Sequence, residues 1–443
     1  MRLMRSFHLK QKSYVIISGS YSIHVPYSTY TLYKTFLIMK QKLVLIGNGM
    51  AGMRTVDELL KLSPDKFDIT VFGAEPHGNY NRIMLSPVLA GDKKLSEIII
   101  NDLQWYQDNK ITLHTNKTVT NIDRGSQQVI ADDGTVADYD RLIIATGSVP
   151  VMLNIPGKDL EGVISFRDIN DVNVMIETAK THKNAIVIGG GLLGLEAANG
   201  LMIQGMNVSV VHRSNTLMSQ QLDQQAADLM RAELEHKGMH FLMNHDTEAL
   251  LGSERVESIR FKDGSEVAAD LVVMAIGVRP NIELAKASGV QCDRGILVDD
   301  TLQTFTPTIY AVGECVQHRK KTFGLVAPLF EQAKVCANHL VDMGIASYTS
   351  TVTSTKLKVT GINLFSAGDF IGEEGTEVMI FKDTARHIYK KLVLKNNIII
   401  GILLYGETTD GLWYFSLLTE GQDIADMRDN ILFGQQHIDG EQG

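Results

Sequence analysis

Short runs of consecutive apolar residues, each followed by a turn and an amphipathic stretch, recur along the chain up to about residue 345. Such runs are too short for helices and are typical of strands buried on both faces of a sheet. Strands that alternate with helical patterns predict parallel sheets, so the expected fold class is α/β with Rossmann-like three-layer domains. The runs span residues 43–46, 67–72, 139–147, 185–188, 208–211 and 271–277.

The pattern changes from about residue 350, where runs at 377–381 and 388–394 alternate in the manner of strands. Asn396 and Asn397 separate the second run from the apolar residues 398–400, a spacing that predicts a β-hairpin. Residues 412–432 have the pattern of a helix. The sequence therefore predicts a small α+β domain over residues 350–443.

Residues 1–38 differ from the rest of the chain, because they hold five basic residues and no acidic one. This composition would suit a transit peptide. The first of the buried strands, however, begins only four residues after Met39. We therefore expect Met39 to be the natural start and residues 1–38 to be a disordered or non-native extension.

Charge and cysteine content narrow the class of protein. The formal charge of −9 argues against nucleic acid or an anionic membrane as a partner. No apolar run approaches the roughly 18 residues that a membrane-spanning helix needs. The three cysteines are far apart, which predicts a reducing, cytoplasmic location without disulfides. They are also too few for an Fe–S cluster held by this chain alone, since such a cluster needs about four thiolates. No metal site is expected.

A glycine-rich turn follows the first apolar run directly. The sequence reads G-x-G-x-x-G and leads into a helical pattern that extends to Leu62. In this context the first glycine permits the tight turn, the second lets the backbone approach a pyrophosphate, and the third lets helix and strand pack closely. The start of the helix then offers free N–H groups to phosphate. The residues of this expected cofactor site are Gly47, Gly49, Met50, Ala51 and Gly52.

The same unit recurs after the run at 185–188, and the repetition strengthens both assignments. The next strand of this second unit ends at His212 and Arg213, where an NADH site would place an acidic residue. An imidazole and a guanidinium attract a 2′-phosphate, so NADPH is favoured over NADH. The residues expected at this site are Gly189, Gly191, Leu192, Leu193, Gly194, His212, Arg213 and Gly277.

Further residues outside the turns are candidates for the first site. Glu75 follows Gly49 by 26 residues, near the place where an acid binds an adenosine ribose. Arg82 is expected to pair with pyrophosphate, and Ser86 lies just beyond it. Glu314 ends a late strand at a Gly-acid pair that can present a carboxylate to a ribityl hydroxyl. Ala145, Thr146, Gly147 and Gly313 complete this group, the first three forming the crossing between the two domains.

The arrangement of two nucleotide-binding units, with one nested inside the other, resembles the flavoproteins that have two dinucleotide-binding domains. Among these flavoproteins, the chain most resembles the FAD/NAD(P)-binding part of the large subunit of NAD(P)H-dependent nitrite reductase. The resemblance implies FAD at the first unit and NADPH or NADH at the second. It places Phe323 and Val326 beside the flavin and Glu196 near the junction of nicotinamide and flavin, as the catalytic candidate. Related ferredoxin and rubredoxin reductases usually carry Lys where this chain has Pro87 and Asp where it has Glu314, so both differences favour the nitrite reductase branch. The residues that carry the resemblance are 46–50, 80–87, 189–196, 221–223, 313–315 and 323–328.

The resemblance also implies the domain boundaries and the activity. It implies an FAD domain over 39–155 and 276–345, an inserted NAD(P) domain over 156–275, and a C-terminal interface domain over 350–443. The expected function is electron transfer from NAD(P)H through FAD to an Fe–S/sirohaem partner in nitrite or nitrate assimilation, with homodimer formation possible. The family's Fe–S and sirohaem regions lie beyond the end of this chain, so it is not expected to reduce nitrite alone.

Three alternatives remain open from the sequence. The chain could be a ferredoxin or rubredoxin reductase, an NAD(P)H oxidase, or a flavin-binding interaction module without turnover. A thiol reductase is disfavoured, because no cysteine falls within residues 80–87, where such enzymes keep one.

Overall fold

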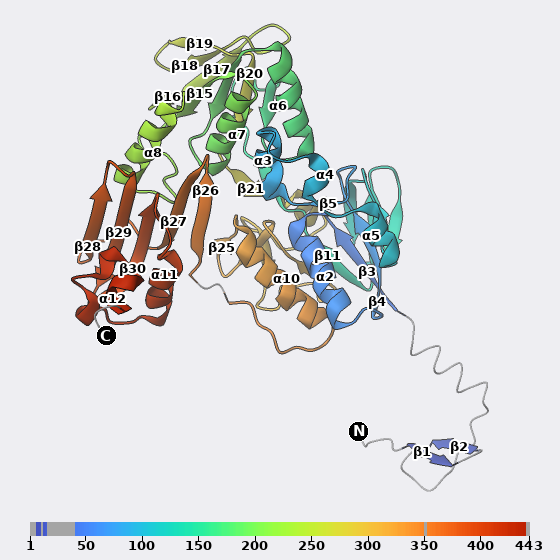
Figure 1. Cartoon of the computed structure of the whole chain (residues 1–443). Helices are drawn as coiled ribbons and strands as arrows, with labels where there is room; N and C mark the ends of the chain where they lie inside the picture. Colours follow the sequence, from blue (N-terminus) through green and yellow to red (C-terminus); the bar gives the residue numbers. More distant parts are fainter. Residues whose placement is uncertain (1–5, 10–11, 16–39, 350–351, 440–443) are drawn as a thin grey trace.

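The computed structural model describes residues 6–9, 12–15, 40–349 and 352–439. Residues 40–349 and 352–439 form three domains (Figure 1). Near the N-terminus, β1 (Ser6–Leu9) and β2 (Lys12–Val15) pair with each other in antiparallel fashion. The remainder of the expected extension, residues 1–38, lies outside the described residues.

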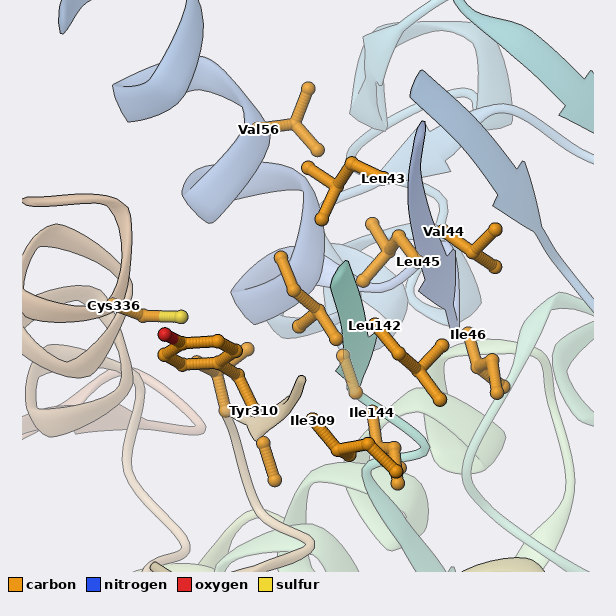
Figure 2. Close-up of a cluster of buried hydrophobic side chains, with 14 of the residues drawn as sticks. Leu43, Val44, Leu45, Ile46, Val56, Leu142, Ile144, Ile309, Tyr310 and Cys336 are labelled. Atoms are coloured by element: carbon orange, nitrogen blue, oxygen red, sulfur yellow. The ribbon is translucent and has the colours of Figure 1, made fainter. Parts of the chain in front are cut away.

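The first domain is built on a five-stranded parallel sheet in which β3 is central. Residues 43–46 of β3 are almost fully buried, as their apolar run predicts. Figure 2 shows labelled side chains of β3, β11 and β23 in the same buried cluster as Val56 of α2 and Cys336 of α10. The sheet order is β23 (Ile309–Ala311), β11 (Arg141–Ile144), β3 (Gln41–Ile46), β4 (Phe67–Phe72) and β7 (Thr112–His114), with helices α2 (Met50–Leu62) and α10 (Val326–Leu340).

A three-stranded antiparallel sheet shares the core of this first domain, to which Val119, Ile122 and Val129 belong. Its strands are β8 (Val119–Asp123), β9 (Gln128–Ala131) and β10 (Val136–Asp138). The later part of the domain adds α9 (Glu283–Ala287), β22 (Ile296–Val298), β24 (Val316–His318) and β25 (Lys321–Thr322).

The second domain repeats the parallel architecture and has three layers. Alternate residues of its central strand point to opposite faces: Ala185 and Val187 pack with the helices, whereas Ile186 and Ile188 pack with an antiparallel sheet. The parallel sheet is β13 (Val163–Ser165), β20 (Leu271–Met274), β14 (Asn184–Ile188), β15 (Asn207–His212) and β16 (His240–Met243). The outer layers are α6 (Ile169–Thr181), α7 (Leu192–Ile203) and α8 (Gln224–His236), and β17 (Thr247–Leu251), β18 (Ser258–Phe261) and β19 (Glu266–Ala268).

The second domain is inserted into the first through two antiparallel segments. These are β12 (Ser148–Pro150) and β21 (Val278–Pro280), which pair with each other. Each follows directly on the strand that lies next to the central strand of a parallel sheet, β11 in the first domain and β20 in the second. The chain therefore enters and leaves the inserted domain at one place, as the nested sequence units predict.

One segment of the first domain packs into the core of the second. Leu85, Val88 and Leu89 are buried with residues of α6 and α7. The fit at Leu89 is close, because a Cβ added at Gly200 of α7 would lie 2.5 Å from Leu89 Cγ. The segment comprises β5 (Asn79–Tyr80), η1 (Arg82–Met84), α3 (Leu85–Leu89) and α4 (Leu95–Ile98). It is followed by β6 (Ile99–Asn101) and α5 (Leu103–Asp108), and Tyr106 of α5 is buried in the core of the first domain.

The third domain is a five-stranded antiparallel sheet with helices on one face. Ile362 and Leu364 of β27 face the second domain, whereas Phe365 and Ala367 face α11. The strand order is β26 (Ser354–Val359), β27 (Ile362–Gly368), β30 (Ile398–Tyr405), β29 (Ile388–Lys395) and β28 (Glu377–Asp383). Figure 1 shows this sheet against α8.

The expected hairpin in this domain is confirmed, but the expected helix is only partly correct. Asn396 and Asn397 both adopt left-handed conformations, with φ of 53° and 58°, as a two-residue hairpin turn requires. The helix predicted over 412–432 ends at Glu420, because Gly421 is left-handed (φ 63°) and redirects the chain. The elements present are α11 (Gly411–Glu420), η2 (Ala425–Met427), η3 (Ile431–Phe433) and α12 (Gln435–Asp439).

No helix among the residues that the structure describes has both the length and the apolar character needed to cross a membrane.

Candidate functional site: two glycine turns joined by polar side chains

The two glycine turns have the same construction. Gly47 and Gly189 are left-handed, with φ of 109° and 128°, and a Cβ at either would lie 2.2 Å and 2.3 Å from the carbonyl oxygens of Ala145 and Ala275. Neither position can therefore carry a side chain without displacing the neighbouring strand. In each turn, the first glycine therefore packs against the end of the neighbouring strand of the sheet, which is β11 for Gly47 and β20 for Gly189.

The other two glycines of each turn also play matching roles. A Cβ at Gly52 or Gly194 would lie 2.8 Å or 1.9 Å from the carbonyl oxygen of the first glycine in its own turn. By contrast, a Cβ at Gly49 or Gly191 would meet nothing within 4 Å. The middle glycine is therefore not required by the packing of the protein itself. Its small size leaves open space in front of the turn, which is what a bound pyrophosphate needs.

The helices that follow the turns begin without side-chain caps. Gly49 precedes α2 and Gly191 precedes α7, and neither helix has an acidic residue in its first turn. Their first N–H groups and the positive ends of their dipoles are thus available to an anion. The predicted residues Met50 and Ala51 form the first turn of α2, and Leu192 and Leu193 that of α7. Both turns fit a dinucleotide.

Glu75, Tyr80 and Arg82 form one cluster beside the first turn. The Arg82 guanidinium pairs with the Glu75 carboxylate and lies over the Tyr80 ring, 4.9 Å from its centroid. Tyr80 Oη donates to Glu75 Oε2 at 2.7 Å. Burial, with the nearby Glu75 carboxylate, raises the pKa of Tyr80 well above its usual range, so its hydroxyl stays protonated. The ribose and pyrophosphate roles of Glu75 and Arg82 remain predictions.

Ser86 and Glu196 meet across the boundary between the two nucleotide-binding domains. Ser86 Oγ, on α3, donates to Glu196 Oε2, on α7, at 2.6 Å. Burial raises the pKa of Glu196, while the hydrogen bond from Ser86 opposes this shift. The candidate catalytic residue is therefore a partly buried carboxylate that links the two domains. Its catalytic role remains a prediction.

Glu314 is held by two side chains that the sequence did not single out. Ser148 Oγ donates to Glu314 Oε2 at 2.7 Å, and Arg167 Nη2 donates to the same oxygen at 2.6 Å. Arg167 comes from the inserted domain, and its backbone carbonyl accepts a hydrogen bond from Arg82 Nη1 at 3.1 Å. Arg167 thus connects the Glu75–Arg82 cluster to Glu314. No motif surrounds Arg167 in the sequence, so only the structure identifies it.

Gly313 brings the late strand against the first glycine turn. A Cβ at Gly313 would lie 3.0 Å from the Ala51 Cβ of α2, and its φ is 96°. Its N–H donates to Gln332 Oε1 of α10 at 2.9 Å, and Gln332 is fully buried. A buried glutamine within a helical apolar pattern carries no sequence signal for this contact. The hydrogen bond between Gly313 and Gln332 fixes the end of β23 to α10.

The remaining residues predicted for the first site surround the same region. Thr146 Oγ1 donates to the Asn281 carbonyl at 2.7 Å, which joins the two crossing segments. Gly147 is left-handed, and a Cβ there would lie 3.8 Å from Arg167 Nη2. Val326 begins α10, which also lacks a side-chain cap. The Phe323 ring packs edge-on against Tyr348, 5.8 Å between centroids.

His212 and Arg213 differ in how free they are to meet a phosphate. The Gly190 N–H donates to His212 Nδ1 at 3.2 Å, and His212 Nε2 lies 3.1 Å from the Thr216 carbonyl oxygen. Burial lowers the pKa of His212, which favours the neutral ring. Arg213 is exposed. The structure therefore leaves Arg213 as the cation that could bind a 2′-phosphate, while His212 supports the turn. Gly277 is left-handed and follows β20.

The three cysteines are free thiols that form no disulfide. Burial raises the pKa of Cys315 to about 11 and that of Cys336 further, so both thiols stay protonated at neutral pH. Cys292 is also unpaired. Within the described ranges, no group of three or more His, Cys, Asp or Glu side chains could hold a metal ion.

Comparison with known proteins identifies the family. Residues 41–339 match the family described as pyridine nucleotide-disulphide oxidoreductase. The chain belongs to this family. Membership implies FAD and NAD(P)H as cofactors, which agrees with the construction of the two turns. Residues 354–422 match the rubredoxin NAD⁺ reductase C-terminal domain family.

Two curated members of the family, both from Bacillus subtilis (strain 168), are similar over most of the chain. The protein named nitrite reductase (NAD(P)H) is 51% identical over 387 residues, which is 87% of this chain and 48% of the relative. The assimilatory nitrate reductase electron transfer subunit is 47% identical over 393 residues, 89% of this chain and 51% of the relative. The chain thus spans about half the length of these relatives.

A solved structure of the family has the same fold throughout. The NADH:rubredoxin oxidoreductase from Clostridium acetobutylicum is 25% identical, with a TM-score of 0.75, and the match covers 91% of this chain and 100% of that one. The predicted α/β class, with two Rossmann-like domains and a small C-terminal domain, is confirmed.

Proposed function

We propose that this chain is an FAD-dependent NAD(P)H oxidoreductase that passes electrons to a protein acceptor carrying an Fe–S or sirohaem centre, in nitrite or nitrate assimilation. The observation that carries the proposal is the pair of equivalent glycine turns, each with open space at its middle glycine and an uncapped helix behind it. The identities of 51% and 47% to the two Bacillus proteins support the choice of acceptor class.

The chain's own residues act by binding and orientation. The first turn, with Glu75, Arg82, Gly313 and Glu314, would hold FAD, and the second turn with Arg213 would hold NAD(P)H. When bound, FAD supplies the hydride-accepting chemistry and divides the electron pair for a one-electron acceptor. The protein supplies the alignment of the reacting groups, which need to approach to about 3–3.5 Å.

Glu196 and Ser86 would fix the angle between the two domains and so between the two cofactors. Their hydrogen bond joins a helix of the inserted domain to a helix of the first domain. No proton transfer by Glu196 is needed in this scheme. We further propose a cytoplasmic location, supported by three cysteines that are all unpaired. Homodimer formation remains a prediction.

The test is an anaerobic titration of the purified, FAD-loaded protein with NADPH and, separately, with NADH, while the visible absorbance of the flavin is followed. The expected result is stoichiometric bleaching by at least one of the two. If neither bleaches the flavin, the protein is not a reductase and the interaction-module alternative is favoured.

A ferredoxin or rubredoxin reductase is the second candidate, because residues 354–422 match the rubredoxin reductase C-terminal domain family. Steady-state assays with ferredoxin, rubredoxin, oxygen and a purified sirohaem protein as acceptors distinguish the candidates. Turnover that is fastest with oxygen would instead indicate an NAD(P)H oxidase.

A further inference from the structure

The third domain is fastened to the second domain along helix α8. Tyr405 Oη donates to Glu233 Oε2 at 2.9 Å near the end of the helix. At the start of the helix, Tyr389 Oη donates to Asp223 Oδ2 at 2.8 Å, and Lys391 Nζ donates to the same oxygen at 3.2 Å. The two tyrosines are thus matching contacts at opposite ends of one helix.

The Asp223 carboxylate is largely shielded from solvent and is contacted by both domains. Its side chain is 13% exposed and that of Lys391 is 9% exposed. Asp223 Oδ1 also accepts from the Ala226 N–H at 3.0 Å and so caps α8. Burial and the hydrogen bond to Asp223 raise the pKa of Tyr389, which keeps its hydroxyl a donor. Removing Lys391 would leave the Asp223 carboxylate without a compensating charge, and removing the Tyr389 hydroxyl would take away one of its hydrogen bonds.

A short series of backbone hydrogen bonds leads from Asp223 to the second glycine turn. The Leu222 N–H donates to the Met218 carbonyl at 2.9 Å, and the Met218 N–H donates to the Gly190 carbonyl at 2.9 Å. The N–H of Gly190 donates to His212. Both backbone groups of Gly190, the residue between the first two glycines, are therefore held by the segment 212–222. The residue that directly follows this segment, Asp223, is the one that Tyr389 and Lys391 of the third domain contact.

The first glycine turn is held in a different way. Its corresponding residue, Asn48, accepts from Tyr106 Oη at 2.6 Å through its side chain. Its backbone carbonyl accepts from Asn79 Nδ2 at 3.1 Å. Both partners belong to the first domain. The connection to the third domain described above therefore runs to the second turn and not to the first.

We propose that Asp223 is a positioning residue through which the C-terminal domain sets the geometry of the NAD(P)H-binding turn. Tyr389 and Lys391 hold Asp223, Asp223 fixes the end of segment 212–222, and that segment holds Gly190. Energetic coupling of this kind travels through packed and hydrogen-bonded elements. The inference rests on the proposed function, because it takes the second turn as the dinucleotide site.

The experiment compares Tyr389→Phe with Tyr405→Phe in the full-length, FAD-loaded protein. Each variant loses one hydroxyl hydrogen bond across the same interface. Affinity is measured by calorimetry with NADP⁺ and NAD⁺, which bind without reducing the flavin. We expect Tyr389→Phe to weaken binding of the preferred nucleotide about 5-fold, within the usual range of such coupling, and Tyr405→Phe to leave it unchanged. Both should lower the melting temperature.

A second variant, Asp223→Asn, keeps an oxygen to cap α8 but removes the charge that Lys391 meets. We expect it to weaken nucleotide binding about 10-fold and to raise KM rather than to lower kcat, while FAD affinity is unchanged. Equal affinities of Tyr389→Phe, Asp223→Asn and wild type would overturn the proposal. Failure of the wild-type protein itself to bind either nucleotide would instead overturn the proposed function.

Discussion

The guanidinium of Arg167 and the carboxylate of Glu314 join the inserted domain to the first domain, with Nη2 and Oε2 2.6 Å apart. Their side chains are 22% and 16% exposed. Because Arg167 also holds Arg82 through its carbonyl, one residue of the inserted domain reaches two parts of the expected flavin site. The residues expected at the flavin site are therefore held in place by contacts from both domains.

Replacing Arg167 by Met should destabilise the protein by about 1–3 kcal/mol, because Glu314 would keep its charge with only Ser148 as a partner. Thermal or urea unfolding measures this loss. The double variant Arg167→Met/Glu314→Gln should recover part of it, since the uncompensated charge is gone. As a matched control, Arg279→Met removes an exposed pair with Glu283 and should change stability by about 0.5 kcal/mol or less. Equal losses in the two single variants would contradict the expectation.

Replacing Arg213 by Glu should weaken NADPH far more than NADH. A contact between a guanidinium and a phosphate is worth about 1.5–3 kcal/mol, which corresponds to roughly 10- to 100-fold in affinity. Comparing KM for the two nucleotides measures the effect. His212→Ala should weaken both nucleotides to a similar degree, because that ring supports Gly190 rather than the phosphate. An equal effect of Arg213→Glu on both nucleotides would remove the case for a 2′-phosphate contact.

Introducing Ala at Gly200 should destabilise the contact between α7 and α3 by about 1–3 kcal/mol, because the new Cβ would press on Leu89 and such overpacking is costly. The measurement is the melting temperature, together with the rate of anaerobic flavin reduction. We expect Gly200→Ala to slow flavin reduction as well as to lower the melting temperature. Adding Leu89→Ala should restore part of the reduction rate, because it makes room for the new Cβ, although the Leu89→Ala change itself removes buried apolar area. No change on adding Leu89→Ala would place the effect elsewhere.

The pH dependence of stability should reveal the partly buried carboxyl group of Glu196. Burial raises the pKa of its carboxyl in the folded protein above the unfolded value of about 4.3. The stability that this group provides is therefore fully present below that unfolded pKa and is lost as the pH rises through the folded pKa. Glu196→Gln removes this loss, so its melting temperature relative to wild type should increase from pH 4 towards pH 7.

A control for this pH profile is Glu235→Gln on α8, whose carboxylate is exposed. The melting temperature of this variant should differ from that of wild type by the same amount at every pH from 4 to 7. If Glu196→Gln also runs parallel to wild type, the burial of that carboxylate has no consequence for stability.

Local sequence patterns were sufficient to predict the structure at positions where a residue's conformation depends mainly on its neighbours in the chain. The glycine turns follow from their spacing, because only glycine tolerates φ of 109° and 128° against a neighbouring carbonyl. The helix after the first turn ends at Leu62, as its pattern predicts. The hairpin at Asn396 and Asn397 follows from two adjacent residues that accept left-handed conformations.

Contacts between distant segments could not be predicted in this way. Arg167 and Glu314 are 147 residues apart, and no periodicity or motif connects them. Leu85 and Leu89 read as part of the first domain, yet they are buried in the core of the second. The helix expected over 412–432 stopped early because Gly421 and a hydrogen bond from the Ile424 N–H to Asn397 turn the chain back to the sheet.

The packing of segment 80–98 against α6 and α7 limits how this protein can be divided. A fragment cut at residues 156 and 275 would expose the apolar surface that α3 normally covers, and such surfaces promote aggregation. A chimera that borrows the NAD(P) domain from a relative must therefore bring the relative's own α3 segment with it. Nucleotide preference and flavin-site sequence are for this reason expected to be inherited together rather than exchanged separately.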